Sequence, residues 1–259
     1  MEPVLSGKIE ELKFVSEFDR SIQECLIMKS RSIPASGIVI YLHGATNHKE
    51  QGFNREIFNG TFGRLQDFLH DKNFVYVCPE YRGDSWMNHA AECDIKQLTG
   101  MLKREFRTEK MFIMGGSMGG TSALIFTTRN PDLVSGVLAL CPATDMKKLY
   151  YQWVGTERDF LAKTIEVAYG GSPEKNPEEY IKRSAIHQIE KFRSIPTAIV
   201  HGDADMLISV EHSRLLINKA LVRGIKLLYH EIKAGDHDSP IRDFEIVEKA
   251  LLWLFSKGQ

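Results

Sequence analysis

Short runs of apolar residues alternate with longer amphipathic segments through most of the chain. Apolar runs that predict buried strands lie near residues 37–43, 74–79, 111–115, 136–141, 197–202 and 226–232. Helical periodicity is found near residues 54–71, 88–106, 118–130, 209–223 and 241–256. Strands that alternate with helices predict an α/β fold, in which a mostly parallel sheet is covered by helices on both faces.

Two segments depart from this alternation. Residues 8–15 and 22–29 are partly alternating apolar segments around Asp19-Arg20, which predicts an antiparallel hairpin at the sheet edge. Residues 143–195 separate two predicted strands by a stretch far longer than an ordinary crossover, and Asn176-Pro177 is a good helix start within it. We therefore expect one domain over residues 1–259, with a helical insertion at about 143–195.

Composition and charge narrow the class of protein. The chain has 259 residues, is 43% hydrophobic and carries a formal net charge of −1, so it offers no electrostatic basis for binding nucleic acid or anionic membranes. The N-terminus lacks the basic start and apolar core of a signal peptide, and no apolar run approaches 18 residues. We expect a cytoplasmic protein whose scattered cysteines are free thiols: Cys25, Cys78, Cys93 and Cys141.

The stretch from Met111 to Phe126 carries the strongest chemical signal. Four apolar residues of a predicted strand lead into Gly115-Gly-Ser-Met-Gly119, and a predicted helix follows. This strand–turn–helix context is the one in which G-x-S-x-G acts as a nucleophile elbow. Small flanking residues let strand and helix approach closely, and the turn exposes the serine oxygen near the helix N-terminus. Ser117 is therefore the predicted nucleophile.

A serine nucleophile needs a base, and the base needs an orienting acid; in this arrangement both follow the serine in the chain. Asp203 and Asp205 follow the predicted strand that ends near residue 202, and either could be the acid. His237 follows the last predicted strand and is the candidate base. Asp236 and Asp238 are too close to His237 in sequence to orient it easily, so we expect solvated charges there.

These motifs make the chain resemble the α/β-hydrolase superfamily. The matching segments are His43-Gly-Ala45, Gly115–Gly119, His201–Asp205 and Gly235-Asp-His237, which together span most of the chain. Within the superfamily the chain most resembles the hydrolase domain of prolyl-oligopeptidase-like enzymes and related carboxylesterases. The segments that suggest this narrower likeness are Pro79–Asp84, Arg183–Ile186 and Ile195-Pro196.

The resemblance implies a catalytic triad of Ser117, Asp205 and His237, and favours Asp205 over Asp203. The chain lacks room for the β-propeller that filters peptides in larger members, which argues against a propeller-gated peptidase. The loop before His237 also reads Gly-Asp-His in place of the commoner Gly-Gly-His. By position in the elbow, one oxyanion donor is the N–H of Met118. The resemblance assigns the other to Ala45.

Related hydrolases carry a cap in the place of the 143–195 segment, which implies a substrate pocket there. Tyr150, Trp153 and Phe160 are the expected pocket residues, with other apolar walls from Leu149, Tyr151 and Tyr169. We expect hydrolysis of small carboxylic esters through an acyl-enzyme, without a cofactor. No His-x-x-x-His or Cys-x-x-Cys pair predicts a metal site.

Two other functions stay open from the sequence. A serine peptidase or aminopeptidase would use the same triad, with Glu157, Asp159 or Glu166 available to bind a substrate amine. A ligand-binding protein without catalysis is disfavoured by the intact serine, acid and histidine positions. The aromatic insertion could also form a homodimer contact.

Overall fold

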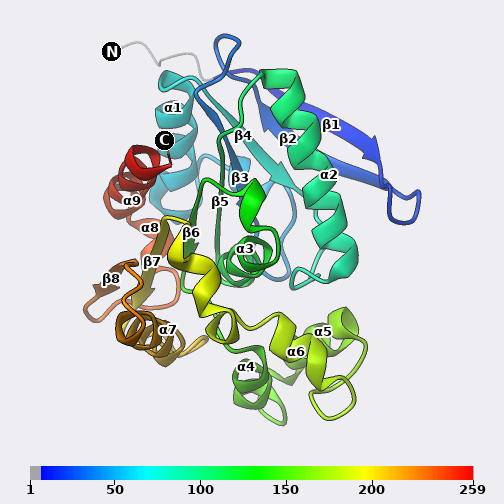
Figure 1. Ribbon diagram of the computed structural model, residues 1–259, viewed down its shortest axis with the longest axis vertical. Coiled ribbons are helices and arrows are strands. Elements are labelled where there is room, and N and C mark those ends of the chain that lie inside the picture. The colour runs from blue at the N-terminus through cyan, green and yellow to red at the C-terminus, as the bar shows by residue number, and fades with distance from the viewer. Residues whose placement is uncertain (1–6, 259) are drawn as a thin grey trace.

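The computed structural model describes residues 7–258, which form an eight-stranded sheet with helices on both faces (Figure 1). The strand order is β1-β2-β4-β3-β5-β6-β7-β8. The pairs β1–β2 and β2–β4 are antiparallel and the other five are parallel, which confirms the mostly parallel sheet and the edge hairpin. The strands are β1 (Ile9–Val15), β2 (Ile22–Met28), β3 (Gly37–Leu42), β4 (Phe74–Pro79), β5 (Met111–Gly116), β6 (Gly136–Leu140), β7 (Thr197–Gly202) and β8 (Leu228–Ile232).

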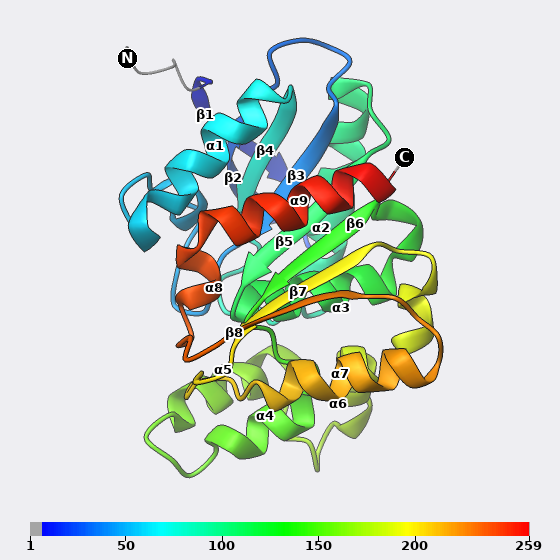
Figure 2. The same cartoon turned by 90° about the vertical axis from the view of Figure 1, so that its left-hand side faces the viewer.

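Alternate residues of the central strands enter two separate hydrophobic layers. On β3, Ile38 and Ile40 pack into one layer while Val39 and Tyr41 pack into the other, as the two-residue period of a strand requires. Helices α1 and α9 cover one face of the sheet, and α2 and α3 cover the opposite face (Figure 2). The helices are α1 (Thr61–Asp71), α2 (His89–Phe106), α3 (Met118–Arg129), α4 (Met146–Trp153), α5 (Asp159–Tyr169), α6 (Pro177–Lys182), α7 (Glu211–Val222), α8 (Ser239–Arg242) and α9 (Phe244–Lys257).

Two helix predictions need correction at their ends. The helix expected from residue 54 begins at Thr61, because Asn59 and Gly60 have left-handed φ values of 58° and 74° that a helix cannot continue through. The helix expected from residue 241 is divided in two. Asp243 separates α8 from α9 and accepts the N–H of Ile246 with its side chain, which starts a new helix.

The helical insertion (residues 143–195) holds α4, α5 and α6, which gather at one end of the molecule in both views. Its aromatic residues are tied to the body. The Tyr169 hydroxyl donates to the Trp86 carbonyl at 2.9 Å, and the Trp86 and Trp153 rings lie 5.8 Å apart. The buried guanidinium of Arg183 donates to the Met87 carbonyl. Several large side chains of the insertion therefore anchor it to the loop that follows β4.

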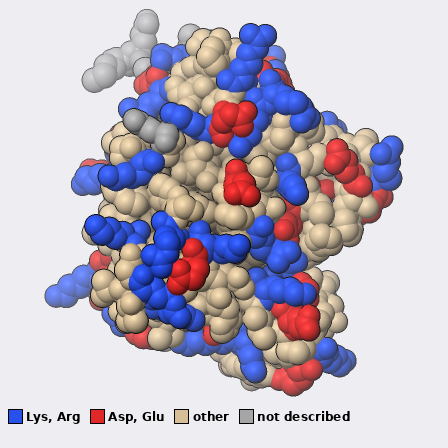
Figure 3. Space-filling view, in the orientation of Figure 1, with Lys and Arg blue, Asp and Glu red and all other residues tan. Residues whose placement is uncertain are grey.

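The surface carries both signs of charge. Lysine and arginine side chains are interspersed with acidic ones on the face shown in Figure 3. Among the described residues, no helix is both long and apolar enough to cross a membrane. The four cysteines are free, and Cys25, Cys78 and Cys141 are buried. Residues 1–6, which are part of the segment examined for a signal peptide, lie outside the described residues.

Candidate active site

Ser117 occupies the turn between β5 and α3. Its backbone has φ 58° and ψ −122°, a conformation that residues with a Cβ rarely adopt. The turn is held on both sides, since Ser117 N–H donates to the Leu140 carbonyl at 2.9 Å and the Thr121 hydroxyl donates to the Ser117 carbonyl at 3.0 Å. The serine is thus held at the end of the central strand by its neighbours.

The glycines around Ser117 allow three backbones to meet. A Cβ added to Gly119 would lie 1.9 Å from the Leu42 carbonyl oxygen, and one added to Gly115 would lie 2.4 Å from the Gly119 carbonyl carbon. No side chain fits at either distance, so α3 can pack this closely on β3 and β5 only because both positions are glycine.

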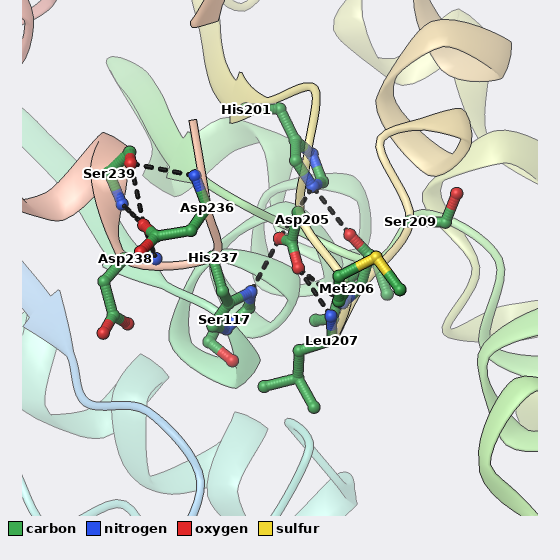
Figure 4. Close-up of polar contacts among 12 residues, drawn as sticks. Ser117, His201, Asp205, Met206, Leu207, Ser209, Asp236, His237, Asp238 and Ser239 are labelled. Atoms are coloured by element: carbon green, nitrogen blue, oxygen red, sulfur yellow. Dashed lines mark hydrogen bonds and ion pairs between the residues drawn. The ribbon is translucent and has the colours of Figure 1, made fainter. Parts of the chain in front are cut away.

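His237 and Asp205 form a close pair beside this turn (Figure 4). The His237 Nδ1 atom lies 2.7 Å from Asp205 Oδ2. A carboxylate only accepts hydrogen bonds, so Nδ1 carries the proton and the neutral ring presents Nε2 as an acceptor. Among the described residues Nε2 has no hydrogen-bond partner, and His237 lines the same cavity as Ser117. No hydrogen bond joins the Ser117 hydroxyl to Nε2 within residues 7–258, as is common in sites without substrate.

Asp205 is held by a full set of donors. Its side chain is 0% exposed, and Oδ1 accepts the N–H groups of Leu207 and Ile208 at 2.8 and 2.9 Å. Burial by itself favours the neutral acid, but hydrogen bonds from His201 and His237 outweigh it and hold the pKa of Asp205 below its ordinary value. The carboxylate is therefore charged wherever the protein is folded near neutral pH.

The other three acidic residues of these loops have different partners. Asp203 accepts the Ala234 N–H at 2.6 Å, so it closes the turn between the two loops and does not contact His237. Asp236 and Asp238 are not simply solvated charges, because both form ion pairs with Arg242 at 2.9 Å. The structure brings Asp205, and not Asp203, to the histidine.

The loop after β3 is fixed by two side chains: His43, which belongs to the His43-Gly-Ala45 segment, and Gln51, which sequence inspection did not single out. The buried His43 ring contacts the Gly44 carbonyl at 2.9 Å and the Glu80 carbonyl at 3.0 Å. Gln51 Oε1 accepts the Gly44 N–H at 2.8 Å, and Gln51 itself lines the cavity. Its position seven residues after Gly44 gives no motif, so only the fold reveals the contact.

The two expected oxyanion positions lie next to this loop and the elbow. Ala45 and Ser117 line the same cavity. Met118 is the first residue of α3, so its N–H has no carbonyl one turn earlier to bond within the helix. The positive end of the α3 dipole adds to the attraction for negative charge there.

The cavity between the sheet and the insertion has a volume of about 510 Å³. Trp153 and Phe160 line it, as expected from the sequence. Tyr150 does not, and that expectation is corrected: its ring is buried and its hydroxyl donates to Glu166, which raises the pKa of Tyr150 to about 12. The apolar part of the wall is formed by Trp86, Trp153, Phe160, Leu161 and Leu207.

Of the three acidic residues considered for amine binding, one reaches the cavity. Glu157 lines it beside Arg158, whose guanidinium donates to the Met206 carbonyl at 2.6 Å. Asp159 accepts the Gly155 N–H at 2.9 Å, and Glu166 pairs with Lys163 at 3.1 Å. Across residues 7–258, His, Cys, Asp and Glu side chains do not gather in threes that could hold a metal ion.

A second histidine lies behind Asp205, and sequence inspection gave it no role beyond its place in the His201–Asp205 segment. His201 is buried, and its Nε2 lies 3.2 Å from Asp205 Oδ2. The signal was present in the spacing, because His201 and Asp205 are four residues apart on either side of the Gly202 turn. A histidine at the end of an apolar strand, however, cannot be told from an ordinary buried side chain by sequence alone.

The sequence of the chain matches a known protein family and a curated relative. Residues 61–258 match the model of the prolyl oligopeptidase family. An uncharacterized peptidase of Bacillus subtilis, YtmA, is 28% identical over 165 residues, which cover 61% of this chain and 62% of that protein. The matched region therefore spans less than two thirds of the curated relative.

Solved structures share the fold at low sequence identity. The substrate-bound serine hydrolase FphF of Staphylococcus aureus, described as fluorophosphonate-binding, has a TM-score of 0.75 at 14% identity, over 96% of this chain and 98% of that one. An S-formylglutathione hydrolase from Agrobacterium tumefaciens has a TM-score of 0.72 at 16% identity, over 99% and 97% of the two chains.

Proposed function

The chain belongs to the prolyl oligopeptidase family of serine hydrolases with the α/β-hydrolase fold, and on that premise we propose that it hydrolyses small carboxylic esters through Ser117, His237 and Asp205. One observation supports the proposal most: His237 donates to Asp205 through Nδ1, its Nε2 has no hydrogen-bond partner among residues 7–258, and the ring lines the same cavity as Ser117. This is the arrangement a general base needs to accept a serine proton.

In the proposed reaction, Ser117 attacks the ester carbonyl as His237 Nε2 takes its proton. The ring becomes an imidazolium whose charge the adjacent Asp205 carboxylate stabilises. His237 then gives the proton to the departing alcohol, leaving an acyl-serine. A water molecule, activated by the same nitrogen, releases the acid and restores Ser117.

The N–H groups of Met118 and Ala45 are the proposed oxyanion donors. Each such donor typically contributes about 2.7–4 kcal/mol to transition-state stabilisation. The His43 and Gln51 contacts support the assignment of Ala45, because they fix the backbone on both sides of Gly44. A donor held in place before the reaction costs no reorganisation when charge develops.

An apolar wall and a cavity of about 510 Å³ favour a small to medium acyl group. We assign the helical insertion as the cap that provides Trp153, Phe160 and Leu161 to this wall. The ester preference has a second support, since the S-formylglutathione hydrolase resembles this chain over nearly its whole length. A cytoplasmic location and a small-molecule partner, in preference to nucleic acid, are part of the proposal.

A peptidase is the second candidate, and one observation favours it. Glu157 lines the cavity, where its carboxylate could bind the amine of a short peptide. The family name and the description of the Bacillus relative as a peptidase point the same way.

The exposed side chains of Phe160, Val167 and Ile181 on the insertion support a homodimer, which analytical ultracentrifugation would test.

The test compares p-nitrophenyl esters of increasing acyl length with aminoacyl-p-nitroanilides, using Ser117→Ala as the control. Ester turnover that peaks at one chain length and falls roughly 10⁶-fold in the control supports the proposal. Faster anilide turnover would move the function to the peptidase. A fluorophosphonate should phosphonylate Ser117 with loss of fluoride, and tryptic mass spectrometry should find the adduct on the elbow peptide. Unchanged ester turnover in Ser117→Ala would refute the mechanism.

A further inference from the structure

A second imidazole lies on the far side of Asp205 from His237 (Figure 4). His201, at the end of β7, has a side chain that is 0% exposed. Its Nε2 lies 3.2 Å from Asp205 Oδ2 and 2.9 Å from the Ile208 carbonyl oxygen. Its Nδ1 lies 2.7 Å from the Ser213 hydroxyl on α7. The ring is therefore held at both nitrogens.

The partners decide which nitrogen carries the proton. A carbonyl and a carboxylate can only accept, so His201 Nε2 is a donor shared between Ile208 and Asp205. In the neutral ring, Nδ1 then accepts the hydrogen of the Ser213 hydroxyl. The result is a directed series of hydrogen bonds from Ser213 to His201 and from His201 to Asp205. His237 donates to the same carboxylate from the other side.

Both imidazoles donate to one and the same oxygen. Asp205 Oδ2 accepts from His237 and His201, while Oδ1 accepts from two backbone N–H groups. With four donors the carboxylate cannot rotate away from His237. The second donor also draws electron density from Oδ2, which limits how strongly Asp205 stabilises the charged His237 ring and so how tightly that ring holds its Nε2 proton.

We propose that His201 and Ser213 are positioning residues of the hydrolytic site: Ser213 fixes the tautomer of His201, and His201 holds the Asp205 oxygen that orients His237. The inference rests on the proposed function, since it concerns the base that activates Ser117. A packed core histidine would need only the Ile208 carbonyl and the Ser213 hydroxyl. The additional contact with Asp205 is what couples the ring to catalysis.

The other ionisable groups around His201 keep their charge state through the pH range of the assay. Glu231 on β8 pairs in register with His201, and the Arg214 guanidinium on α7 lowers the pKa of Glu231 to about 2. Burial, with the nearby charge of Lys148, lowers the pKa of His212 to about 4, and Asp145 opposes that shift. Burial raises the pKa of the Cys141 thiol well above its usual value. Between about pH 5 and 9 these neighbours therefore add no titration of their own to the acid limb of activity.

The experiment uses a matched pair of substitutions in the full chain. In His201→Gln, the amide nitrogen reaches about the position of Nε2 and keeps a donor for Asp205. In His201→Met, a side chain of similar length has no donor. The pH dependence of kcat/KM for a p-nitrophenyl ester is measured for both and for the wild type, after thermal melts show that each is folded.

Without the His201 donor, the Asp205 carboxylate stabilises the charged His237 ring more strongly. The ring then holds its Nε2 proton more tightly. We expect the acid limb of His201→Met to move up by about half a pH unit or more, with His201→Gln close to the wild type. The midpoint of the limb does not depend on how much protein is folded, so a purely structural role would leave it in place. Equal midpoints in all three proteins would overturn the proposal.

Ser213 supplies a second test should His201→Met fail to fold. Ser213→Ala removes the group that fixes the ring and should shift the acid limb in the same direction, whereas Ser213→Thr keeps the hydroxyl and should not. An unshifted limb in Ser213→Ala would refute the assigned role of Ser213. These outcomes are separate from failure of the proposed function, which would appear as activity that survives in Ser117→Ala.

Discussion

Replacing Asp205 by asparagine tests the hydrogen-bond arrangement directly, because the two side chains have nearly the same shape. Oδ1 of Asp205 accepts the N–H groups of Leu207 and Ile208. An asparagine keeps both bonds only with its carbonyl oxygen in that place. Its NH₂ group then takes the position of Oδ2, which lies 2.7 Å from His237 Nδ1. Two donors would face each other across that distance.

The ring can relieve this conflict by carrying its proton on Nε2. In that tautomer it no longer accepts the Ser117 proton, and the imidazolium loses its neighbouring charge. The loss in kcat for a triad acid changed to its amide is about 10⁴-fold. At 1.36 kcal/mol per factor of ten, this corresponds to about 5.4 kcal/mol of transition-state stabilisation.

The assay is ester hydrolysis by Asp205→Asn near pH 8, with Asp203→Asn as the matched control. Asp203 accepts one backbone N–H from Ala234, which an asparagine oxygen also accepts, so activity should stay within about twofold of the wild type. More than a tenth of wild-type kcat in Asp205→Asn, or a larger loss in Asp203→Asn, would refute the assignment of the acid.

Three further predictions follow from other parts of the structure. Gly119→Ala places a Cβ 1.9 Å from the Leu42 oxygen and should lower the free energy of unfolding in urea by about 3 kcal/mol or more. The control Gly100→Ala, within α2, should raise it by about 0.5–1 kcal/mol. A Gly119→Ala protein as stable as the wild type would contradict the backbone contact. Burial lowers the pKa of His212 to about 4, against about 6.5 in the unfolded chain. The free energy of unfolding should therefore be unaffected by this group above pH 6.5 and should fall by about 3 kcal/mol as pH drops from 6.5 to 4. His212→Asn should make this decline shallower, and a pH profile identical to that of the wild type would refute the reasoning. Trp153→Ala should lengthen the preferred acyl chain and Tyr150→Phe should leave it unchanged, because only Trp153 lines the cavity; an unaltered optimum in Trp153→Ala would exclude its role in the wall.

Local sequence signals predicted the sheet and the approximate positions of Ser117 and His237. The elbow is predictable because β3, β5 and α3 approach one another so closely there that only glycine fits, and the glycines are visible in the sequence. The order of strands and helices is predictable because each apolar run is short and bounded by turns. The start of α1 at Thr61 was also within reach, since Asn59-Gly60 is a turn signal that should have outweighed the helical periodicity before it.

Side-chain partnerships across the fold were beyond the sequence. Tyr150 and Trp153 lie on the same helix with similar character, yet one donates to Glu166 and the other lines the cavity. Which of them faces the cavity depends on the packing of α4 against α5, which no periodicity specifies. The contact of His201 with Asp205 likewise requires the loop to fold back, and Gln51 reaches Gly44 only through the turn between them.

The division of the cavity between two sources has a consequence for how this protein can evolve. Ser117, Asp205 and His237 follow strands of the sheet, whereas Trp153, Phe160 and Leu161 come from one continuous stretch of the insertion. Mutations of the cavity-lining side chains in that stretch alter what fits against the serine without changing the strands that carry the three polar residues. Substrate range can therefore drift under selection while the reaction chemistry is inherited unchanged, and a mutant library at the largely exposed Phe160 would explore new substrates at less risk to the fold than one at the buried Trp153.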